Sequence, residues 1–363
     1  MGKLMTGKPT RTWLHALLLI AGLALLWPLQ ANAQQTRFKV AWSIYSGWMP
    51  WGYAAEHGIV DKWADKYGID IEMVQFNDYI ESINQYTAGD FDACTMTNMD
   101  ALTLPAASGV DTTAFILGDY SDGNDAIVLK NGTTMRDIKG RRVNLVELSV
   151  SHYLLARALD MHGLSEKDVT VVNTSDADAA SSFLTRDVTA AAAWNPQLSR
   201  IMAQSPDAVQ VFTSKQIPGE IIDMMAAKTE VLKDNPALAK ALTGAWFETL
   251  ALMRSDTDAA ADARAEMARD SGTDLAGYDA QLALTHIFYS PAEAHRFTAA
   301  PGLRETMNKV RRFSFEKGLL GESTPSPDAI GMAFDDGSRL GDQHNVKLRF
   351  DARYVKLAAD GGL

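Results

Sequence analysis

Residues 140–196 constrain the fold more than any other stretch, because four apolar runs there are separated by turn residues at regular intervals. Residues 142–148, 169–173 and 188–194 are short and apolar or β-branched, which predicts strands. Residues 150–164 carry apolar side chains at helical spacing, residues 178–184 are helix-like, and Pro196 can open a further helix. This alternation predicts right-handed crossovers and a parallel sheet.

The preceding residues repeat this rhythm, with strands expected at 38–44, 69–76, 91–97 and 112–117. Helices are expected over 53–64, over 80–88 and up to residue 107. Ligands of open α/β sheets bind beyond the carboxyl ends of the strands. The ends within residues 140–196 carry Glu147, Ser149, Trp194 and Asn195. Acidic and aromatic residues at the other predicted strand ends and crossings are Trp48, Asp78, Tyr79, Asp100, Asp119, Tyr120 and Asp223.

Ordinary structural roles compete with these assignments. Asp is a common helix N-cap, so Asp78 and Asp100 can simply begin helices. Asp119 can belong to a hinge turn, and Trp194 can belong to the core. These alternatives stay open on the sequence alone.

The first residues predict a secretory signal. Lys3, Lys8 and Arg11 precede an apolar run at 13–29, and the small residues Ala31 and Ala33 follow it. The run is short for a membrane span, so cleavage after Ala33 is expected rather than anchoring. No Cys follows that position, which argues against a lipid anchor and predicts a free periplasmic protein.

Charge and motifs narrow the function. Removal of three basic residues with the signal moves the formal net charge from -11 to -14, which argues against nucleic acid and anionic lipid as partners. Cys94 has no second cysteine to pair with and is expected to be a buried small apolar residue. No metalloprotease, hydrolase or phosphate-loop motif occurs, so no enzyme activity, metal or cofactor is expected.

A family resemblance rests on residues 140–196. The segment resembles the second lobe of solute-binding proteins of nitrate, sulfonate and taurine type ABC importers. The matching residues are Gly140, Val143, Ser151, His152, Leu154, Leu155, Ala158, Leu159, Gly163, Leu164, Asp168, Val169, Trp194 and Pro196. The turn departs from the family pattern, because Glu147-Leu148-Ser149 replaces the usual Pro and Gly.

The resemblance implies an α/β, two-lobed type II periplasmic binding protein with mostly parallel sheets and a ligand cleft between the lobes. It implies a signal at 1–33, a first lobe at 37–124 and 221–320, a second lobe at 125–220, and a tail at 321–363. Hinges are expected near residues 121–125 and 218–219. The partners implied are a small ligand, an ABC permease and its ATPase, and a monomer is expected. The tail over 345–356 alternates, which predicts an edge strand or a segment packed on the back of a lobe.

The resemblance also carries ligand contacts onto the loops after the first-lobe strands. The positions are Ser46 to Trp48, Asp78, Tyr79, Asn98 to Asp100, Asp119 and Tyr120.

Glu147 directs the ligand prediction. Relatives that bind anions use free N–H groups at this helix start, where a carboxylate would repel an anion and attract a cation or a strong N–H donor. The segment around Glu147 and the Trp48–Tyr53 start also resemble the subgroup associated with urea carboxylase, whose enzyme is linked to urea and guanidine. The prediction is therefore guanidinium or urea, bound by Glu147 with one or two of Asp78, Asp100, Asp119 and Asp223, between walls from Trp48, Tyr79 or Trp194. The alternatives are a thiamine-pyrimidine precursor, a sulfonate, taurine or nitrate in the same fold, and an enzyme on this scaffold.

Overall fold

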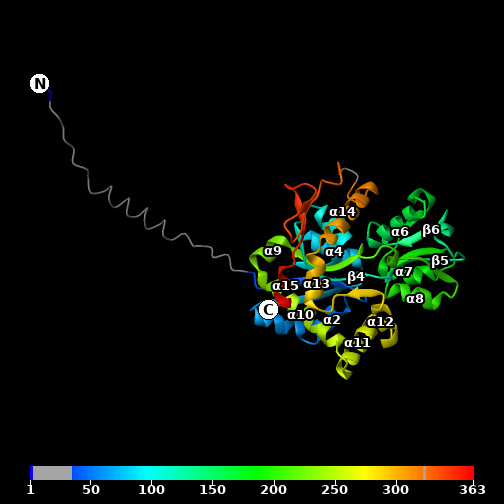
Figure 1. Cartoon of the computed structure of the whole chain (residues 1–363), viewed down its shortest axis with the longest axis horizontal. Helices are drawn as coiled ribbons and strands as arrows, with labels where there is room; N and C mark the ends of the chain where they lie inside the picture. The colour runs from blue at the N-terminus through cyan, green and yellow to red at the C-terminus, as the bar shows by residue number, and fades with distance from the viewer. Residues whose placement is uncertain (3–34, 322–323) are drawn as a thin grey trace. The chain divides into compact units, whose positions relative to one another are not determined.

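The computed structural model describes residues 1–2, 35–321 and 324–363. The predicted cleavage position at Ala33 and the apolar run before it lie outside these residues. Residues 36–363 form one unit that contains two sheets with helices packed against them (Figure 1).

The larger sheet is mixed and has nine strands in the order β13-β12-β14-β4-β10-β3-β1-β2, with β11 paired to β4. Its strands are β1 (Arg37–Ser43), β2 (Asp70–Phe76), β3 (Ala93–Thr97), β4 (Thr112–Ser121), β10 (Ile222–Lys228), β11 (Thr285–Ile287), β12 (Gly331–Ala333), β13 (Arg339–Leu340) and β14 (Val346–Phe350). The neighbours β1, β2 and β3 are parallel, so their carboxyl ends meet at one edge, whereas β10 runs antiparallel to β3 and to β4.

The smaller sheet has five strands in the order β7-β6-β8-β5-β9. They are β5 (Asp125–Lys130), β6 (Arg142–Leu145), β7 (Thr170–Asn173), β8 (Ala190–Trp194) and β9 (Ala208–Thr213). The predicted parallel order of β6, β7 and β8 is confirmed, while β5 is antiparallel to both of its neighbours. The carboxyl ends of β6 and β8 lie on the same edge as the start of β5, because Asp125 pairs with Trp194.

Helices of the larger sheet are α2 (Met49–Glu56), α3 (Ile59–Lys66), α4 (Tyr79–Ala88), α5 (Asn98–Ala101), α9 (Thr229–Asp234), α10 (Pro236–Arg254), α11 (Asp258–Asp270), α12 (Leu275–Leu282), α13 (Pro291–Thr298), α14 (Pro301–Glu316) and α15 (Arg353–Ala359). Helices α6 (Val150–Met161), α7 (Ala179–Phe183) and α8 (Gln197–Gln204) pack on the smaller sheet (Figure 1). Single helical turns lie at Leu102–Ala106, Met135–Ile138, Glu166–Asp168, Asp176–Asp178 and Ser214–Gln216. No helix in the described ranges is both long and apolar enough to cross a membrane.

Several predicted ends of elements and one predicted placement differ from the structure. The helix expected over 53–64 is divided into α2 and α3 at Gly58, whose φ of 67° takes it out of the helical region. Strand β4 continues through Ser121 instead of ending near residue 117. The tail strand β14 lies between β12 and β4, inside the sheet rather than at its edge.

Both connections between the two sheets meet at one point. β4 leads into β5 through residues 122–124, and β9 returns to β10 through residues 214–221. The Ser121 and Ser214 hydroxyls are 2.7 Å apart, and the Ser214 hydroxyl accepts the Gly123 N–H at 2.7 Å. The two crossings are therefore bonded to each other where a hinge was predicted.

Candidate ligand-binding site

A small cavity lies between the two sheets. It is lined by Tyr45, Trp48, Tyr79, Thr97, Asp125, Val150, Trp194, Ile221 and Asp223. The space open to the centre of a water molecule is ≈ 20 Å³. That volume admits one or two water-sized groups, so only a ligand of a few heavy atoms fits without opening the lobes.

Four aromatic rings form one part of the cavity wall. Tyr45 and Trp48 lie in the turn after β1, Tyr79 is the first residue of α4 after β2, and Trp194 is the last residue of β8. The Tyr79 ring centroid lies 5.7 Å from that of Trp48 and 5.6 Å from that of Trp194. Tyr45 meets Trp48 edge-on at 5.1 Å. Rings from both sheets therefore surround the space.

Two carboxyls supply the charge of the lining. Asp125 begins β5 and is 4% exposed, and Asp223 lies on β10 and is 5% exposed. The Ser121 hydroxyl donates to Asp125 at 2.5 Å. The nine lining residues include no Lys, Arg or His. The cavity is consequently acidic, and it suits a cation or a strong N–H donor better than an anion.

Two more carboxyls stand behind the aromatic wall. The Tyr79 hydroxyl donates to Asp100 at 2.6 Å, and Thr97 donates to the same oxygen at 2.9 Å. The Tyr45 hydroxyl donates to Asp119 at 2.9 Å. Each wall tyrosine is thus held in place by a buried acid.

Burial raises the pKa of all four acids. It raises the pKa of Asp100 and Asp125 to about 6 and that of Asp119 to about 7, against the opposing effect of hydrogen bonds to each group. The pKa of Asp223 lies well above its ordinary value, because of burial and then the charges of Asp119 and Asp125. The empty site therefore retains protons near neutral pH.

Glu147 does not lie in this cavity, which corrects the central prediction. β6 ends at Leu145, and the following turn, with Leu148 at a φ of 60°, leaves the Glu147 side chain exposed. Glu147 lines a separate outer pocket together with Asp78, whose carboxylate caps α4 by accepting the Glu81 N–H at 2.9 Å.

Five other predicted residues lie outside the lining and have structural partners. Ser46 donates to Gln281, Asn98 joins the main chains of Glu220 and Ile222, Ser149 caps α6, Asn195 accepts from Ser199, and Tyr120 stacks on His286. Successive side chains of a strand point to opposite faces, so Tyr120 points away from the side where Asp119 lies. Their predicted role in ligand contact is not supported by the cavity lining.

Of the predicted ligand contacts, Trp48, Tyr79, Trp194 and Asp223 line the cavity. The lining also includes five residues that were not predicted: Tyr45, Thr97, Asp125, Val150 and Ile221. Asp125 was interpreted as a hinge turn, yet it is the first residue of the strand that enters the smaller sheet. Asp125 pairs with Trp194 in the sheet, and no local sequence pattern indicates that pairing.

Contacts around the cavity join the two sheets. The Tyr79 N–H donates to Asp176 at 3.0 Å, and the Ser175 hydroxyl donates to Asp78 at 2.8 Å. Asp176 and Ser175 follow β7, whereas Asp78 and Tyr79 follow β2. The described structure is therefore a closed arrangement around the cavity.

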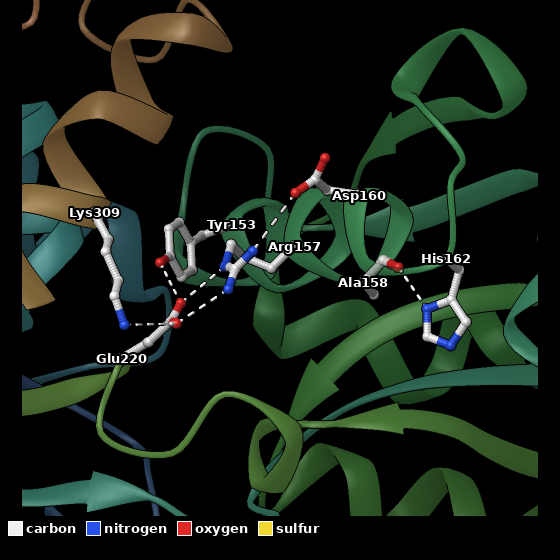
Figure 2. A network of polar contacts seen from close by, with 7 residues as sticks. All are labelled: Tyr153, Arg157, Ala158, Asp160, His162, Glu220 and Lys309. Atoms are coloured by element: carbon white, nitrogen blue, oxygen red, sulfur yellow. Dashed lines mark hydrogen bonds and ion pairs between the residues drawn. The ribbon is translucent and has the colours of Figure 1, made fainter.

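A second network joins α6 to the returning crossing (Figure 2). Glu220 is 7% exposed and accepts the Tyr153 hydroxyl at 2.6 Å and Arg157 at 2.9 and 3.1 Å. Lys309 of α14 lies 4.0 Å away on the other side of the same carboxylate. Burial raises the pKa of Glu220, but Arg157 and Tyr153 outweigh it and hold the pKa below its ordinary value.

A group of acidic side chains away from the cavity is close enough together to share a metal ion. Within the described ranges, the side chains close enough to share one ion are Glu56, Glu266 and Asp270. They lie outside the cavity lining, and Glu266 already contacts His57 at 2.7 Å.

The sequence matches a known family over more than half of its length. A family described as NMT1/THI5 like matches residues 65–260 of the 363. The chain belongs to the NMT1/THI5-like family. A curated relative in Brucella abortus, named as a binding protein, is 26% identical over 194 residues. The match covers 52% of this chain and 57% of that protein, so the chain spans little more than half the length of the relative.

Solved structures show the same fold. The alkanesulfonate-binding protein SsuA from Xanthomonas axonopodis pv. citri, bound to MOPS, has a TM-score of 0.67 at 17% identity and covers 80% of this chain and 96% of its own. The nitrate-binding protein NrtA from Synechocystis PCC 6803 has a TM-score of 0.57 at 13% identity and covers 91% and 99%. The predicted α/β two-lobed periplasmic binding fold is confirmed, with mixed sheets. The predicted urea and guanidine subgroup stays a prediction.

Proposed function

We propose that this family member is the periplasmic solute-binding component of an ABC importer and that its ligand is a small planar N–H-rich cation, for which guanidinium is the best fit. The observation that carries the proposal is the pair of carboxyls, Asp125 and Asp223, in an aromatic cavity whose lining has no basic side chain. A carboxylate accepts paired N–H bonds, and an aromatic face attracts a planar cation.

Capture proceeds by lobe closure. Asp125 and Trp194 belong to the smaller sheet, whereas Trp48, Tyr79 and Asp223 belong to the larger one, so a ligand in the cavity contacts both. A ligand that binds only the closed arrangement shifts the population toward it. The permease would then recognise the closed form.

A second candidate ligand is an oxyanion, because solved relatives are named for alkanesulfonate and nitrate. Protonated carboxyls can donate to an anion, and the acids of this cavity have raised pKa values. The cavity is small beside MOPS, however, and its ionised form repels any anion.

The two ligand classes predict opposite pH dependence. Thermal unfolding is measured with guanidinium at low millimolar, urea, taurine and nitrate, with sodium chloride as the ionic-strength control. A ligand at about 100 times its dissociation constant adds ~2.7 kcal/mol, which gives a clear rise in Tm. For guanidinium this rise should shrink as the pH falls through about 6, since the carboxyls become neutral.

A Tm rise with taurine or nitrate that grows toward low pH would contradict the cation proposal and leave the fold assignment intact. Recovery of guanidinium unaltered after incubation separates binding from catalysis.

A further inference from the structure

Asp119 and Asp223 form a buried cross-strand pair. They are register partners on β4 and β10, Asp119 is 0% exposed and Asp223 is 5% exposed. As directly opposed residues on neighbouring strands, they place their carboxyls side by side on the same face of the sheet. Two buried carboxylates that face each other repel when both are ionised, so one proton on the pair is favoured.

In the part of the chain that the structure describes, no basic side chain forms an ion pair with Asp119 or Asp223. In the described residues, no donor reaches the second oxygen of Asp119. The titratable groups that face the pair are Tyr45 after β1, Asp125 of β5, Tyr278 of α12 and Tyr289 after β11.

Gly47 closes the main chain over the pair. A Cβ at this position would lie 2.9 Å from the second oxygen of Asp119 and 2.5 Å from the Tyr45 ring. Only glycine permits so close an approach, and the approach helps to keep water from the pair. The pair therefore neutralises its charge with a proton or with a ligand.

We propose that the Asp119–Asp223 pair holds one shared proton while the cavity is empty and releases it when a cation binds, so that capture exchanges a cation for a proton. Guanidinium brings one positive charge and the proton removes one, so the net charge of the site is unchanged. Urea brings no charge and displaces no proton. The pair thus helps to distinguish guanidinium from its neutral isostere. This inference rests on the proposed cation ligand.

Proton counting tests the exchange directly. Guanidinium chloride is added to weakly buffered protein near neutral pH, a pH-stat counts the protons released, and sodium chloride and urea serve as controls. We expect about one proton per bound guanidinium and none for urea, because two facing carboxyls share one proton.

Two variants locate the source of the proton. In Asp119→Asn the amide can donate to Asp223, so proton release should fall to near zero. The matched control Asp122→Asn, outside the cavity lining, should release the same amount as the parent protein.

Tyr45→Phe keeps the ring and removes the hydroxyl that donates to Asp119. This variant should raise the pH at which guanidinium affinity is half-maximal. A purely structural defect would not produce that shift.

The outcomes are separable. Guanidinium binding without proton release, or undiminished release in Asp119→Asn, would overturn the exchange and leave cation capture standing. Absence of guanidinium binding, with a Tm rise for another ligand, would overturn both. If Asp119→Asn does not fold, the unshifted pH profile of Tyr45→Phe would be the contradicting result.

Discussion

Asp223 affects stability and binding in opposite directions. Its carboxyl is buried on β10, and burial together with the charges of Asp119 and Asp125 raises its pKa. Ionisation therefore destabilises the empty protein, yet the ionised form is the one that attracts a cation. Functional sites commonly carry such a conflict between stability and activity.

Asp223→Asn should separate the two effects. An amide at this position can donate to Asp119, so the Tm of the empty protein should rise at about pH 8. The loss of one charge-assisted hydrogen bond, ~1.5–3 kcal/mol, should weaken guanidinium binding about 10- to 100-fold. Titration calorimetry and thermal unfolding measure both, with Asp122→Asn as the control. Unchanged affinity would exclude Asp223 from ligand contact.

Trp48 should contribute a planar wall that recognises the cation. Trp48→Leu removes a ring that can interact with a cation at ~0.5–2 kcal/mol, so guanidinium affinity should fall about 3- to 30-fold. Trp51→Leu is the matched control, because Trp51 is equally buried but stacks on Trp246 at 4.8 Å, outside the cavity lining. Both variants should lose stability. Only Trp48→Leu should lose affinity, and equal losses would refute the wall assignment.

Individual site residues could be predicted from the sequence where the end of a strand fixes the direction in which their side chains point. Trp48 caps the helix that follows β1, Tyr79 begins the helix that follows β2, and Trp194 ends β8; all three line the cavity. Glu147 follows a strand too, but a turn with a left-handed residue points it outward. That conformation at Leu148, a bulky non-glycine residue, is rare and leaves no local sequence signal.

At the scale of elements, α6 connects the cavity to the hinge. Val150 at its start lines the cavity, and Tyr153 and Arg157 one and two turns later hold Glu220 of the returning crossing (Figure 2). The Tyr153 ring also packs edge-on against Phe313 of α14 at 4.8 Å. Movement of α6 with a ligand would therefore disturb contacts at the hinge.

Glu220→Gln should weaken closure without touching the ligand. The substitution removes the charge that Arg157 and Lys309 face and costs ~1–3 kcal/mol, because a buried charge-assisted bond is lost. Tm and guanidinium affinity should both fall, and small-angle scattering should show a more open empty protein. Asp160→Asn is the control: its carboxylate lies 3.8 Å from Arg157 but is 71% exposed, so it should have little effect. Equal effects of both variants would argue against a role in closure.

The order of the helices and strands could be predicted from the sequence more accurately than the residues at which they begin and end. Alternating apolar runs indicated β6, α6, β7, α7 and β8 in the correct order, because each run has the length and period of its element. The extension of β4 to Ser121 depends on pairing with β10 and β11, which lie more than 100 residues later in the chain. Such long-range pairing is absent from any local pattern.

At the scale of the whole molecule, the sheet gathers strands from both ends of the described unit. β14 pairs with β4, and β12 pairs with β14, so the tail is part of the larger sheet. The alternation at 345–356 indicated a strand but could not indicate its partner. The cavity likewise draws residues from both sheets, and its composition depends on their closure rather than on any one segment.

Buried acids should give the whole molecule an unusual pH profile of stability. Asp100, Asp119, Asp125 and Asp176 have raised pKa values of about 6, 7, 6 and 6, so between about pH 4 and 7 the folded protein binds more protons than the unfolded chain. The free energy of unfolding then falls as pH rises through this window. The Tm of the empty protein should therefore be higher at about pH 5 than at about pH 8. Saturating guanidinium should reduce this difference by the share of the Asp119–Asp223 pair, because the cation replaces the proton of that pair. A Tm that rises with pH would contradict the raised pKa values of these acids. A difference that guanidinium leaves unchanged would show that the Asp119–Asp223 pair does not exchange its proton for the cation.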